Sequence, residues 1–304
     1  MVQILVNSLL QGATLGLLAI GLTVTFSILR FANFAHGEFA MIGAYAAYVL
    51  SIVIGLPFII AAGLGVAVAG GMALFADTMV FGRLRNASPI ALIIASLGLS
   101  MVIRAIFGAA FGADEVGYEL PLASHYRLFG AVITSRQVTI IGVAAASLVT
   151  FHLLLKRTKL GKSMRALSDD PSLARGRGLN VERIIKYTWF IGGCYAGLTG
   201  VLIGAESIVW PDLGYELLLP VFAATIIGGV GNVHGAVLGA MLLALVENLM
   251  LAINWSPLFQ AFGFFADQDF VFVKTQYRSA FAFIVLVIVL IWRPTGILRQ
   301  ARPS

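Results

Sequence analysis

Residues 156–186 read KRTKLGKSMRALSDDPSLARGRGLNVERIIK, and this charged stretch decides how the rest of the chain is interpreted. It holds nine of the chain's 20 lysine and arginine residues, together with Asp169, Asp170 and Glu182, whereas the sequence on either side is apolar. A long charged segment between apolar runs must lie in water, and an excess of Lys and Arg places it on the cytoplasmic side of a membrane. The stretch therefore predicts a membrane protein and fixes its orientation.

The composition of the 304 residues agrees, because 60% are hydrophobic, 11% are charged and the mean hydropathy is +0.96. Soluble domains carry about 25% charged residues. The apolar runs are long and lack a two-residue alternation, which predicts helices and not a β-barrel. The expected fold is therefore all-α, a polytopic transmembrane helix bundle of about eight or nine spans that forms one domain over residues 1–304. The net charge of +6 is mostly loop charge, so we expect no nucleic-acid partner.

A short cytoplasmic helix is predicted inside the charged stretch, over roughly Pro171–Arg177. Ser168 or Asp169 is placed to cap its start, proline suits its first turn, and Gly178 suits its end. A short exposed helix between two spans suits an element that a partner protein grips. A solvated charge run without a partner explains the same residues, and both interpretations stay open at this point.

The distribution of charge predicts a single orientation of the spans. With the 156–186 loop inside, the N-terminus lies outside, the C-terminus lies in the cytoplasm, and 15 of the 20 basic residues fall inside. This arrangement has nine crossings if Leu217–Val230 crosses the membrane. That segment has about 14 residues against the usual ~20 and ends in a glycine-rich run, which is also typical of a broken helix that lines a cavity.

Ionisable side chains at membrane depth are costly and mark either functional sites or structural pairs. They are His36, Glu38, Arg104 and Glu247, with Asp77 nearer the surface. A structural pair explains Arg104, Glu247 and Asp77 at least as well as a function does. His36 and Glu38 stand two apart, so they do not share a helix face, and we expect an irregular backbone around them.

Glycines supply the remaining pattern. Gly37, between His36 and Glu38, permits the irregular entrance of the second span, and Gly231, Gly235 and Gly239 are spaced by four, which favours packing against a neighbouring helix. The four histidines are scattered without metal-ligand spacing, so we expect no metal site. No nucleophile stands beside a histidine and an acid, so we expect no enzyme activity.

Four separated motifs together resemble one known family. They are NFAHGE (33–38), RALSDDPSLARGRGLN (165–180), IIGGVGNVHGAVLGA (226–240) and RPTGIL (293–298). On these motifs the chain is similar from end to end, and in the same order, to the LivH-type permeases, which are membrane subunits of ATP-binding-cassette (ABC) importers for branched-chain amino acids in the bacterial inner (cytoplasmic) membrane. Members are often described with eight spans, against the nine counted from the charges.

The resemblance implies site residues in two places. The 156–186 loop is similar to the coupling loop of ABC permeases, in which an acid is followed by small residues and then glycine. The pore is implied to be apolar enough for aliphatic side chains. The coupling residues implied are Asp169, which replaces the usual Glu, with Asp170, Ala174 and Gly178. The translocation candidates are Asn33, His36, Gly37, Glu38, Gly228, Gly229, Gly231 and Glu247.

The resemblance also implies partners. A second permease, either LivM-like or a second copy of the chain, completes the pore within the lipid membrane. Two cytoplasmic ATP-binding subunits use ATP and Mg²⁺, so this chain itself binds no cofactor. A periplasmic or extracellular substrate-binding protein delivers the solute. Alternating access then moves branched-chain or other hydrophobic amino acids into the cell.

Two alternatives stay open. Importers of urea, amides or aromatic compounds belong to the same branch of the family, so the sequence does not name the substrate. A passive channel or an ion-coupled carrier belongs to a different class. Ion-coupled carriers often show internal repeats and paired intramembrane carboxylates. We find no clear repeat in the sequence and only scattered acids, which favours the importer.

Overall fold

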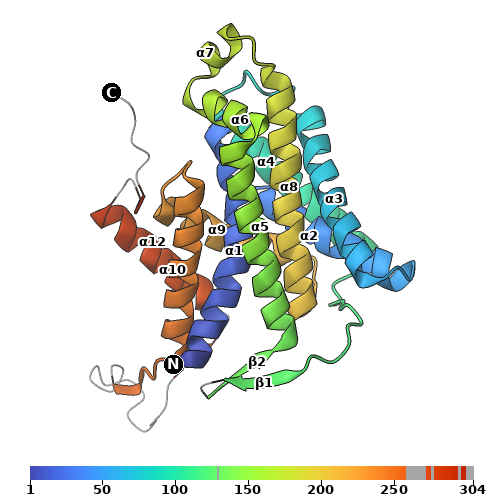
Figure 1. Cartoon of the computed structure of the whole chain (residues 1–304), viewed down its shortest axis with the longest axis vertical. Coiled ribbons are helices and arrows are strands. Elements are labelled where there is room, and N and C mark those ends of the chain that lie inside the picture. The colour runs from blue at the N-terminus through green and yellow to red at the C-terminus, as the bar shows by residue number, and fades with distance from the viewer. Residues whose placement is uncertain (129, 258–271, 275–276, 294–295, 299–304) are drawn as a thin grey trace.

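The computed structural model describes residues 1–128, 130–257, 272–274, 277–293 and 296–298, and these residues form an elongated helix bundle (Figure 1). The predicted all-α polytopic bundle is confirmed. A small antiparallel hairpin at one end supplies the only strands among the described residues. The elements are α1 Val2–Leu29, α2 His36–Tyr48 with a π-helical end Val49–Val53, α3 Phe58–Ala76 with a π-helical end Asp77–Phe81, α4 Pro89–Phe111, β1 His125–Leu128, β2 Ala131–Thr134, α5 Ser135–Arg157, α6 Lys159–Asp169, α7 Pro171–Gly176, α8 Val181–Glu206, α9 Leu213–Gly228, α10 Val233–Ala252 and α12 Arg278–Trp292.

Polar side chains cap the starts of several of these helices. Thr134 and Gln137 form a reciprocal capping box at the start of α5. The side chain of Asn180 accepts the backbone N–H of Arg183 at the start of α8, at 3.0 Å. Such caps satisfy backbone donors that have no partner within the helix.

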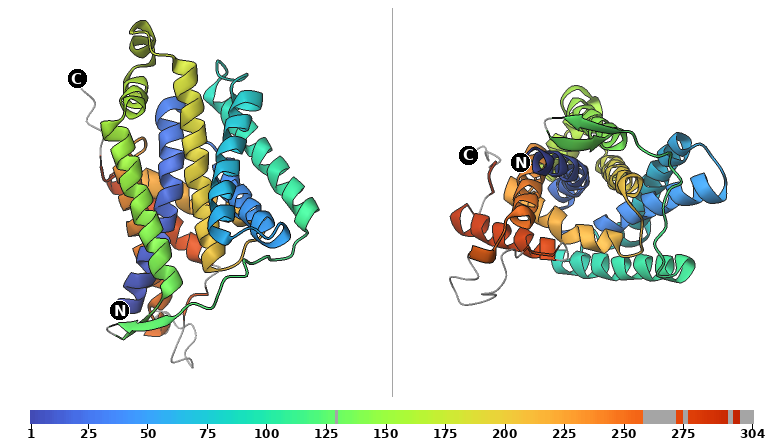
Figure 2. Two further views of the ribbon diagram at one scale, coloured as in Figure 1. Left: turned by 45° about the vertical axis from the view of Figure 1, so that its right-hand side comes forward. Right: turned by 90° about the horizontal axis from the view of Figure 1, so that it is seen from below.

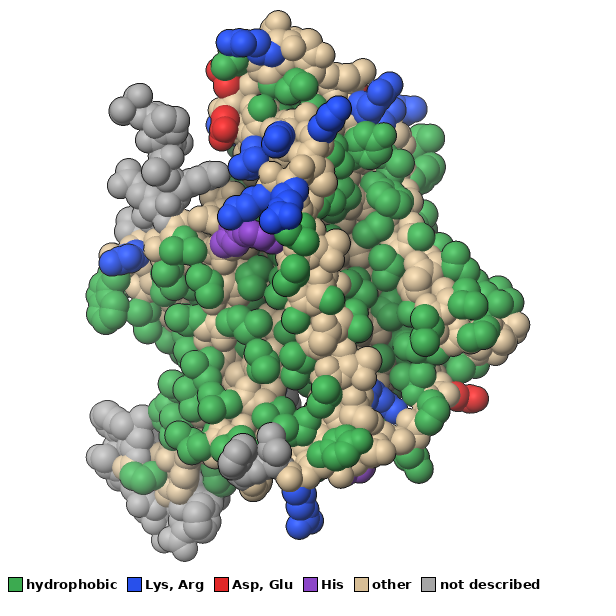
Figure 3. Space-filling model, in the orientation of Figure 1, with side chains coloured by type: hydrophobic (Ala, Val, Ile, Leu, Met, Phe, Trp, Pro, Cys, Tyr) green, Lys and Arg blue, Asp and Glu red, His purple; other side chains and the backbone are tan. Residues whose placement is uncertain are grey.

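Within the described residues, seven helices are long and apolar enough to cross a membrane, and Leu213–Gly228 and Ala280–Trp292 are shorter apolar helices. The outer helices α4 and α5 expose much of their apolar surface, as expected for a face that meets lipid. Lysine and arginine side chains gather over the end that carries α6 and α7 (Figure 3). The chain is therefore a multi-pass membrane protein with one strongly basic end.

The second crossing is helical only in part, because α2 begins deep inside the bundle. After α1 the chain turns back at Arg30, in the left-handed conformation, and residues 31–35 are not helical. His36, the first residue of α2, lies 3.2 Å from the carbonyl oxygen of Leu18. Leu18 is 11 residues before the end of α1, which corresponds to about 16 Å along the axis. The irregular entrance expected from the sequence is present, but in residues 31–35.

The short segment predicted around Leu217–Val230 is α9, and it too starts inside the bundle. A Cβ at Gly37, in the first turn of α2, would collide with the backbone of Gly214, in the first turn of α9. The two helix starts therefore meet, and their glycines permit the contact. Seen from below, α9 lies between α10 and α2 (Figure 2). Its 16 residues span about 24 Å, less than the ~30 Å hydrocarbon core.

The helices α1, α2 and α3 form a unit that recurs in the opposite direction as α8, α9 and α10. Each unit has a long helix, a segment that returns into the bundle, a helix that begins inside it, and a third helix. The units interlock, since α1 packs along α10 and α8 packs along α3, while α2 contacts α8 and α9 contacts α1. The absence of a clear repeat in the sequence was therefore misleading, because the repeat is one of backbone geometry.

Candidate functional site

Four of the translocation candidates lie at or just before the start of α2, and the surrounding protein buries all of them. Asn33 accepts the backbone N–H of Ala35 at 3.1 Å, which holds the non-helical segment just before the helix. The imidazole Nε2 of His36 lies within hydrogen-bond distance of the carbonyl oxygen of Leu18 in α1. Asn33, His36 and Glu38 are each only 1% exposed. This region is a packed junction and not an open channel in the structure.

Glu38 faces α4, away from His36, as expected for two residues two positions apart in a helix. The Ser100 hydroxyl donates to its Oε1 at 2.7 Å, while its Oε2 is buried without a hydrogen-bond partner in the described part of the chain. Nearby, Arg104 forms an ion pair with Asp212 at 3.5 Å and lies 4.6 Å from the ring centroid of Tyr215. The structural pair considered for Arg104 is thus present.

Gly37 has a different role from the one expected. It is helical, and its backbone is not in the left-handed region. The expectation that it permits an irregular backbone is therefore wrong. Its lack of a side chain is needed because the backbone of Gly214 occupies the space where a Cβ would stand.

The glycine run Gly228–Gly231 lies at the other end of α9. Gly229 and Gly231 have φ values of 106° and 86°, which favour glycine, and Gly228 packs against the backbone of Gly235 in α10. The expected packing of the glycine stripe is seen for Gly235 and Gly239, which meet the backbone of α9, whereas Gly231 lies in the turn before α10. Fourteen residues of α9, about 21 Å, separate this run from the junction at Gly214. The structure does not bring the two sets of translocation candidates together.

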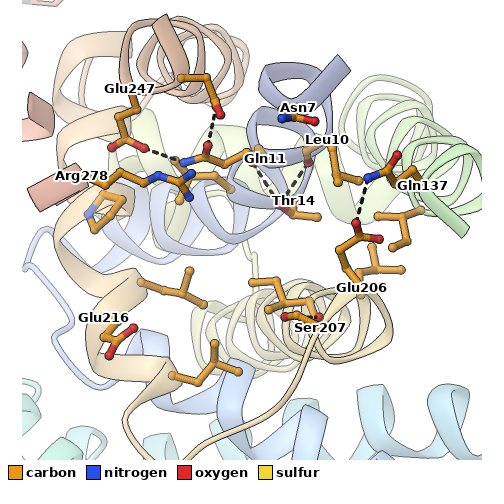
Figure 4. A pocket seen from close by; sticks show the side chains of 18 of the residues that line it. Asn7, Leu10, Gln11, Thr14, Gln137, Glu206, Ser207, Glu216, Glu247 and Arg278 are labelled. Atoms are coloured by element: carbon orange, nitrogen blue, oxygen red, sulfur yellow. Dashed lines mark hydrogen bonds between the residues drawn. The ribbon is translucent and has the colours of Figure 1, made fainter. Parts of the chain in front are cut away.

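A cavity of about 840 Å³ opens near the end of the bundle that carries the N-terminus and the hairpin (Figure 4). It reaches from the start of α5 and the end of α8 to the first half of α9 and the start of α12, and it borders the first half of α1 and the end of α10. Its walls combine aliphatic side chains with amides and charged groups. They include Asn7, Leu10, Gln11, Thr14, Leu15, Gln137, Ile140, Leu202, Ile203, Glu206, Ser207, Trp210, Leu213, Glu216, Leu217, Pro220, Glu247, Asn248 and Arg278.

Two hydrogen-bonded groups organise the polar part of this cavity. Gln11 of α1 donates to Oε2 of Glu247 at 2.5 Å, and its own oxygen accepts from Asn248 at 2.7 Å. On the other side, Gln137 donates to Glu206 at 2.9 Å. Both interactions join helices far apart in the sequence, so they hold the walls of the cavity in place.

Glu247 is the only residue among the translocation candidates that lines this cavity. Sequence reasoning missed Gln11, Glu206 and Glu216, because uncharged amides and acids near span ends give no distinctive signal. Arg278, which the charge distribution would place in a loop outside the membrane, is the first residue of α12 and lines the cavity. A charged residue at the immediate start of an apolar run was the available clue.

The charged 156–186 stretch contains two helices where one was predicted. The additional helix, α6, covers Lys159–Asp169 and buries Met164 and Leu167 against the bundle. Its signal was an apolar residue every three or four positions, which the high charge obscured. The predicted second helix is present as α7, and Gly178 follows it with a φ of 81°.

The cap of α7 is Asp170, so the assignment of that role to Ser168 or Asp169 is wrong. Asp170 accepts the hydroxyl of Ser172 at 2.6 Å and the backbone N–H groups of Ser172 and Leu173 at 2.8 and 3.0 Å. These hydrogen bonds, that of the Ser172 hydroxyl first, hold the pKa of the Asp170 carboxyl below its usual range. Asp169 instead ends α6.

Ala174, one of the implied coupling residues, faces the bundle and not the outside of α7. Ala174 is 4% exposed and packs into this chain, so it does not offer a small surface to a partner. Leu173 is 58% exposed on the same short helix. The helix therefore projects an aliphatic side chain beside Arg175 and Arg177.

The described residues contain no group of three or more His, Cys, Asp or Glu that could hold a metal ion. The structure does bring together two histidines that the sequence leaves 82 positions apart. Nδ1 of His152 and Nε2 of His234 lie 2.8 Å from each other where α5 meets the start of α10. A pair of this kind falls short of a metal site.

Comparison with known proteins gives consistent matches over nearly the whole chain. The sequence pattern of the family described as "Branched-chain amino acid transport system / permease component" matches residues 4–290. The permease LivH of Escherichia coli, a high-affinity branched-chain amino acid transport system protein, is 27% identical over 97% of this chain and 94% of its own. BraD of Pseudomonas aeruginosa, described in the same terms, is 30% identical over 97% and 95%.

Two further matches are more distant. LivM of Escherichia coli, a permease of the same transport system, is 26% identical over 95% of this chain and 68% of its own. Among solved structures, PsaBC from Streptococcus pneumoniae in complex with a Fab has a TM-score of 0.50 and 18% identity, covering 93% of this chain and 90% of its own. That likeness concerns the fold alone.

Proposed function

We propose, from the premise that this chain belongs to the branched-chain amino acid transport permease family, that it carries aliphatic amino acids into the cell. The match to permeases of that name over 97% of the chain is the observation that carries this conclusion. The chain is a transport subunit of an ABC importer and not an enzyme. The cavity lined by aliphatic and polar side chains suits solutes of this class.

The orientation proposed places the α6–α7 end in the cytoplasm. The supporting observation is the gathering of lysine and arginine at that end, which follows the rule for cytoplasmic loops (Figure 3). The N-terminus and the hairpin then lie outside, and the C-terminus lies inside. A cysteine replacing Glu119 should react with an impermeant reagent added outside, whereas one replacing Ser172 should react only after the membrane is opened; the reverse pattern overturns the orientation.

The partners proposed are a second permease, two ATP-binding subunits and a substrate-binding protein outside. The similarity to both LivH and LivM supports a pore built from two related chains. The projection of α7 beyond the bundle supports ATPase docking on that helix, with Asp169, Asp170 and Gly178 shaping it and Leu173 at the contact. ATP and Mg²⁺ are then used by the partner subunits, and this chain binds no cofactor.

The translocation candidates divide into two groups under this proposal. Asn33, His36, Gly37 and Glu38 support the junction of α2 with α9, and Gly228, Gly229 and Gly231 form the cytoplasmic turn of α9. Only Glu247 is proposed to face the solute. Rocking of the two inverted units against each other would open the path alternately to each side.

Uptake in cells tests the proposal. Deleting the gene should abolish ATP-dependent uptake of radiolabelled leucine, isoleucine and valine at low concentration, and a plasmid copy should restore it. Unchanged uptake of all three in the deletion strain, with reduced uptake of urea, an amide or an aromatic acid, would mean that the substrate is a different one. The assignment as an importer would stand. Uptake that persists when ATP is depleted would contradict the importer itself.

A further inference from the structure

We propose that a groove between α5 and α10, at the basic end of the bundle, binds one anionic phospholipid. An acyl chain lies in the groove, and the phosphate lies against His152, His234 and Lys156. This site goes beyond the proposed transport function and does not depend on which solute is carried. It gives a role to the pair of histidines, which takes no part in the cavity or in α7.

The groove is apolar and opens on the outside of the bundle. Both α5 and α10 pack on α1, and a hollow of about 310 Å³ between them is lined by Ile20 of α1 (Figure 1). Apart from the two histidines, every residue that lines the hollow is aliphatic or aromatic. Leu238 of the lining is exposed, as are Val149 and Leu153 on α5. A surface of this kind at membrane depth meets lipid chains, because it offers no polar group to water.

The end of the groove that lies toward the basic end of the bundle carries positive and donor groups. Nδ1 of His152 and Nε2 of His234 lie 2.8 Å apart. Lys156 follows His152 by one turn of α5, about 6 Å along the axis, and its charge is close enough to act on the ring of His234. Figure 3 shows histidine side chains directly beneath a cluster of lysine and arginine side chains on this face. An anion at this point therefore meets several such groups at once.

These groups retain capacity to bind an anion. The contact between the two rings uses one nitrogen of each, so at least one of the two remaining nitrogens carries a hydrogen, whichever ring donates. Lys156 and Arg165 form no ion pair with a carboxylate in the described part of the chain. Phosphate oxygens accept hydrogen bonds from both kinds of group, and such charge-assisted bonds are strong.

A second hollow of about 230 Å³ continues the groove toward α6. Leu155, Val233 and His234 line both hollows, so the two adjoin. Arg165 and Asp169 of α6 also line the second one. The carboxylate of Asp169 disfavours a second phosphate there and suits the hydroxyl or ammonium groups of a headgroup. The site therefore fits a single phosphodiester with its headgroup directed toward α6.

The depth of the charged groups matches that of a lipid phosphate. Lys156 lies in the last turn of α5, whose 23 residues span about 35 Å, slightly more than the ~30 Å hydrocarbon core. The basic groups therefore lie at the boundary of the core, while the apolar groove extends into it. Basic pockets between transmembrane helices on the cytoplasmic side suit anionic headgroups. Any phospholipid can place a chain in the groove, so the charges decide which lipid is retained.

Photolabelling of the full chain in nanodiscs tests the site. A phosphatidylglycerol and a phosphatidylcholine with the same diazirine-bearing acyl chain are each added in trace amounts to phosphatidylcholine nanodiscs. Phosphatidylglycerol should label the groove-lining peptides of α5 and α10 at least about fivefold more, the factor expected for one basic residue near an anionic surface. Excess free glycerol phosphate should not reduce this labelling. Equal labelling by the two lipids, or loss of labelling with glycerol phosphate, overturns the proposal.

Charge variants test the phosphate contacts. Lys156→Gln, and His152→Gln combined with His234→Gln, should each remove most of the preference for phosphatidylglycerol and leave labelling by phosphatidylcholine unchanged. Arg183→Gln, which removes an exposed arginine at the same end that lines neither hollow, is the matched control for overall charge. An unchanged preference in both test variants, or an equal loss in the control, would mean that general charge and not this site attracts the lipid.

A variant of the groove tests the acyl chain separately. Leu238→Trp should fill the groove and reduce labelling by both lipids, whereas Leu242→Trp, also exposed on α10 but outside the groove, should not. Equal labelling of these two variants would contradict an acyl chain in the groove. A crosslink from a cysteine at position 238 to a partner subunit of the assembled complex would show that protein covers the groove, and this would overturn the proposal.

Discussion

The starts of α2 and α9 occupy similar places in the two inverted units but have different surroundings. Around the start of α2, Asn33, His36 and Glu38 are almost completely buried, and each makes a hydrogen bond. Around the start of α9, Asp212 and Glu216 are exposed, and Glu216 and Leu217 line the cavity. One start is part of the packed interior, and the other borders open space.

This difference separates scaffold from solute path. A buried polar group must be satisfied, so the residues at the start of α2 fix one arrangement of the neighbouring helices. Asp212 pairs with Arg104, but an exposed acid such as Glu216 has no such constraint and remains available to a ligand. The same geometry thus serves packing in one unit and, under the proposed function, binding in the other. Three changes test this distinction, and a fourth at α7 gives a comparison far from both starts.

The largest effect is expected for Gly37→Val or Gly214→Val, at the contact between the two starts. The new side chain would meet the backbone of the opposite helix, which cannot move aside. We expect a loss above about 3 kcal/mol, the upper end of ordinary overpacking, seen as aggregation in fluorescence-detected size-exclusion chromatography. Gly71→Val, where no atom lies within 4 Å of the added Cβ, is the control. A monodisperse Gly37→Val protein would mean that the starts do not touch.

A smaller effect on stability is expected for Ser100→Ala. The change removes the hydroxyl that donates to Glu38 and leaves a buried carboxyl with no such donor. The expected cost is about 1–3 kcal/mol, measurable as a lower midpoint in thermal unfolding in detergent. Ser147→Ala, which removes a half-buried hydroxyl that bonds only within its own helix, is the comparison. Equal midpoints for both variants would place Glu38 outside the scaffold.

Leu217→Trp tests the open side of the comparison. The larger side chain should fill part of the cavity without disturbing packing, so uptake should fall by about tenfold while thermal stability stays the same; a tenfold change corresponds to about 1.4 kcal/mol in the barrier. Leu219→Trp, two positions away and outside the cavity, should transport normally. Normal uptake by Leu217→Trp would remove the cavity from the solute path.

The smallest effect is expected at the cytoplasmic helix α7, far from both starts. Asp170 has a lowered pKa in the folded chain, so its stabilising contribution is present above its unfolded pKa of about 3.9 and is lost as pH falls through the lower folded value. Asp170→Asn should retain much of the cap and lose this dependence, whereas Asp170→Ala should loosen α7 at every pH. Hydrogen exchange of residues 171–176 measures this loosening. Equal exchange in the wild type and the Ala variant would contradict the capping role.

The sequence by itself determined the fold class, because a run of about 20 apolar residues can satisfy its backbone in lipid only as a helix. It also indicated which loops are basic, where α7 begins and ends within a residue or two, and which family the chain resembles. These conclusions depend on local composition and on short motifs. The order of charged residues and glycines along the chain supports these conclusions, and no information about which helices are neighbours is needed.

Only the tertiary structure decided how the helices share their interior. The contact of Gly37 with Gly214, the pairing of Gln11 with Glu247 and the place of Arg278 in a cavity each join residues well over 100 positions apart, or depend on such a contact. No local pattern encodes these distances, because each helix alone would bury or expose the same side chains in many ways. The close packing of the two inverted units selects one of these arrangements. The cavity beside α9 remains where the side chains do not fill the space.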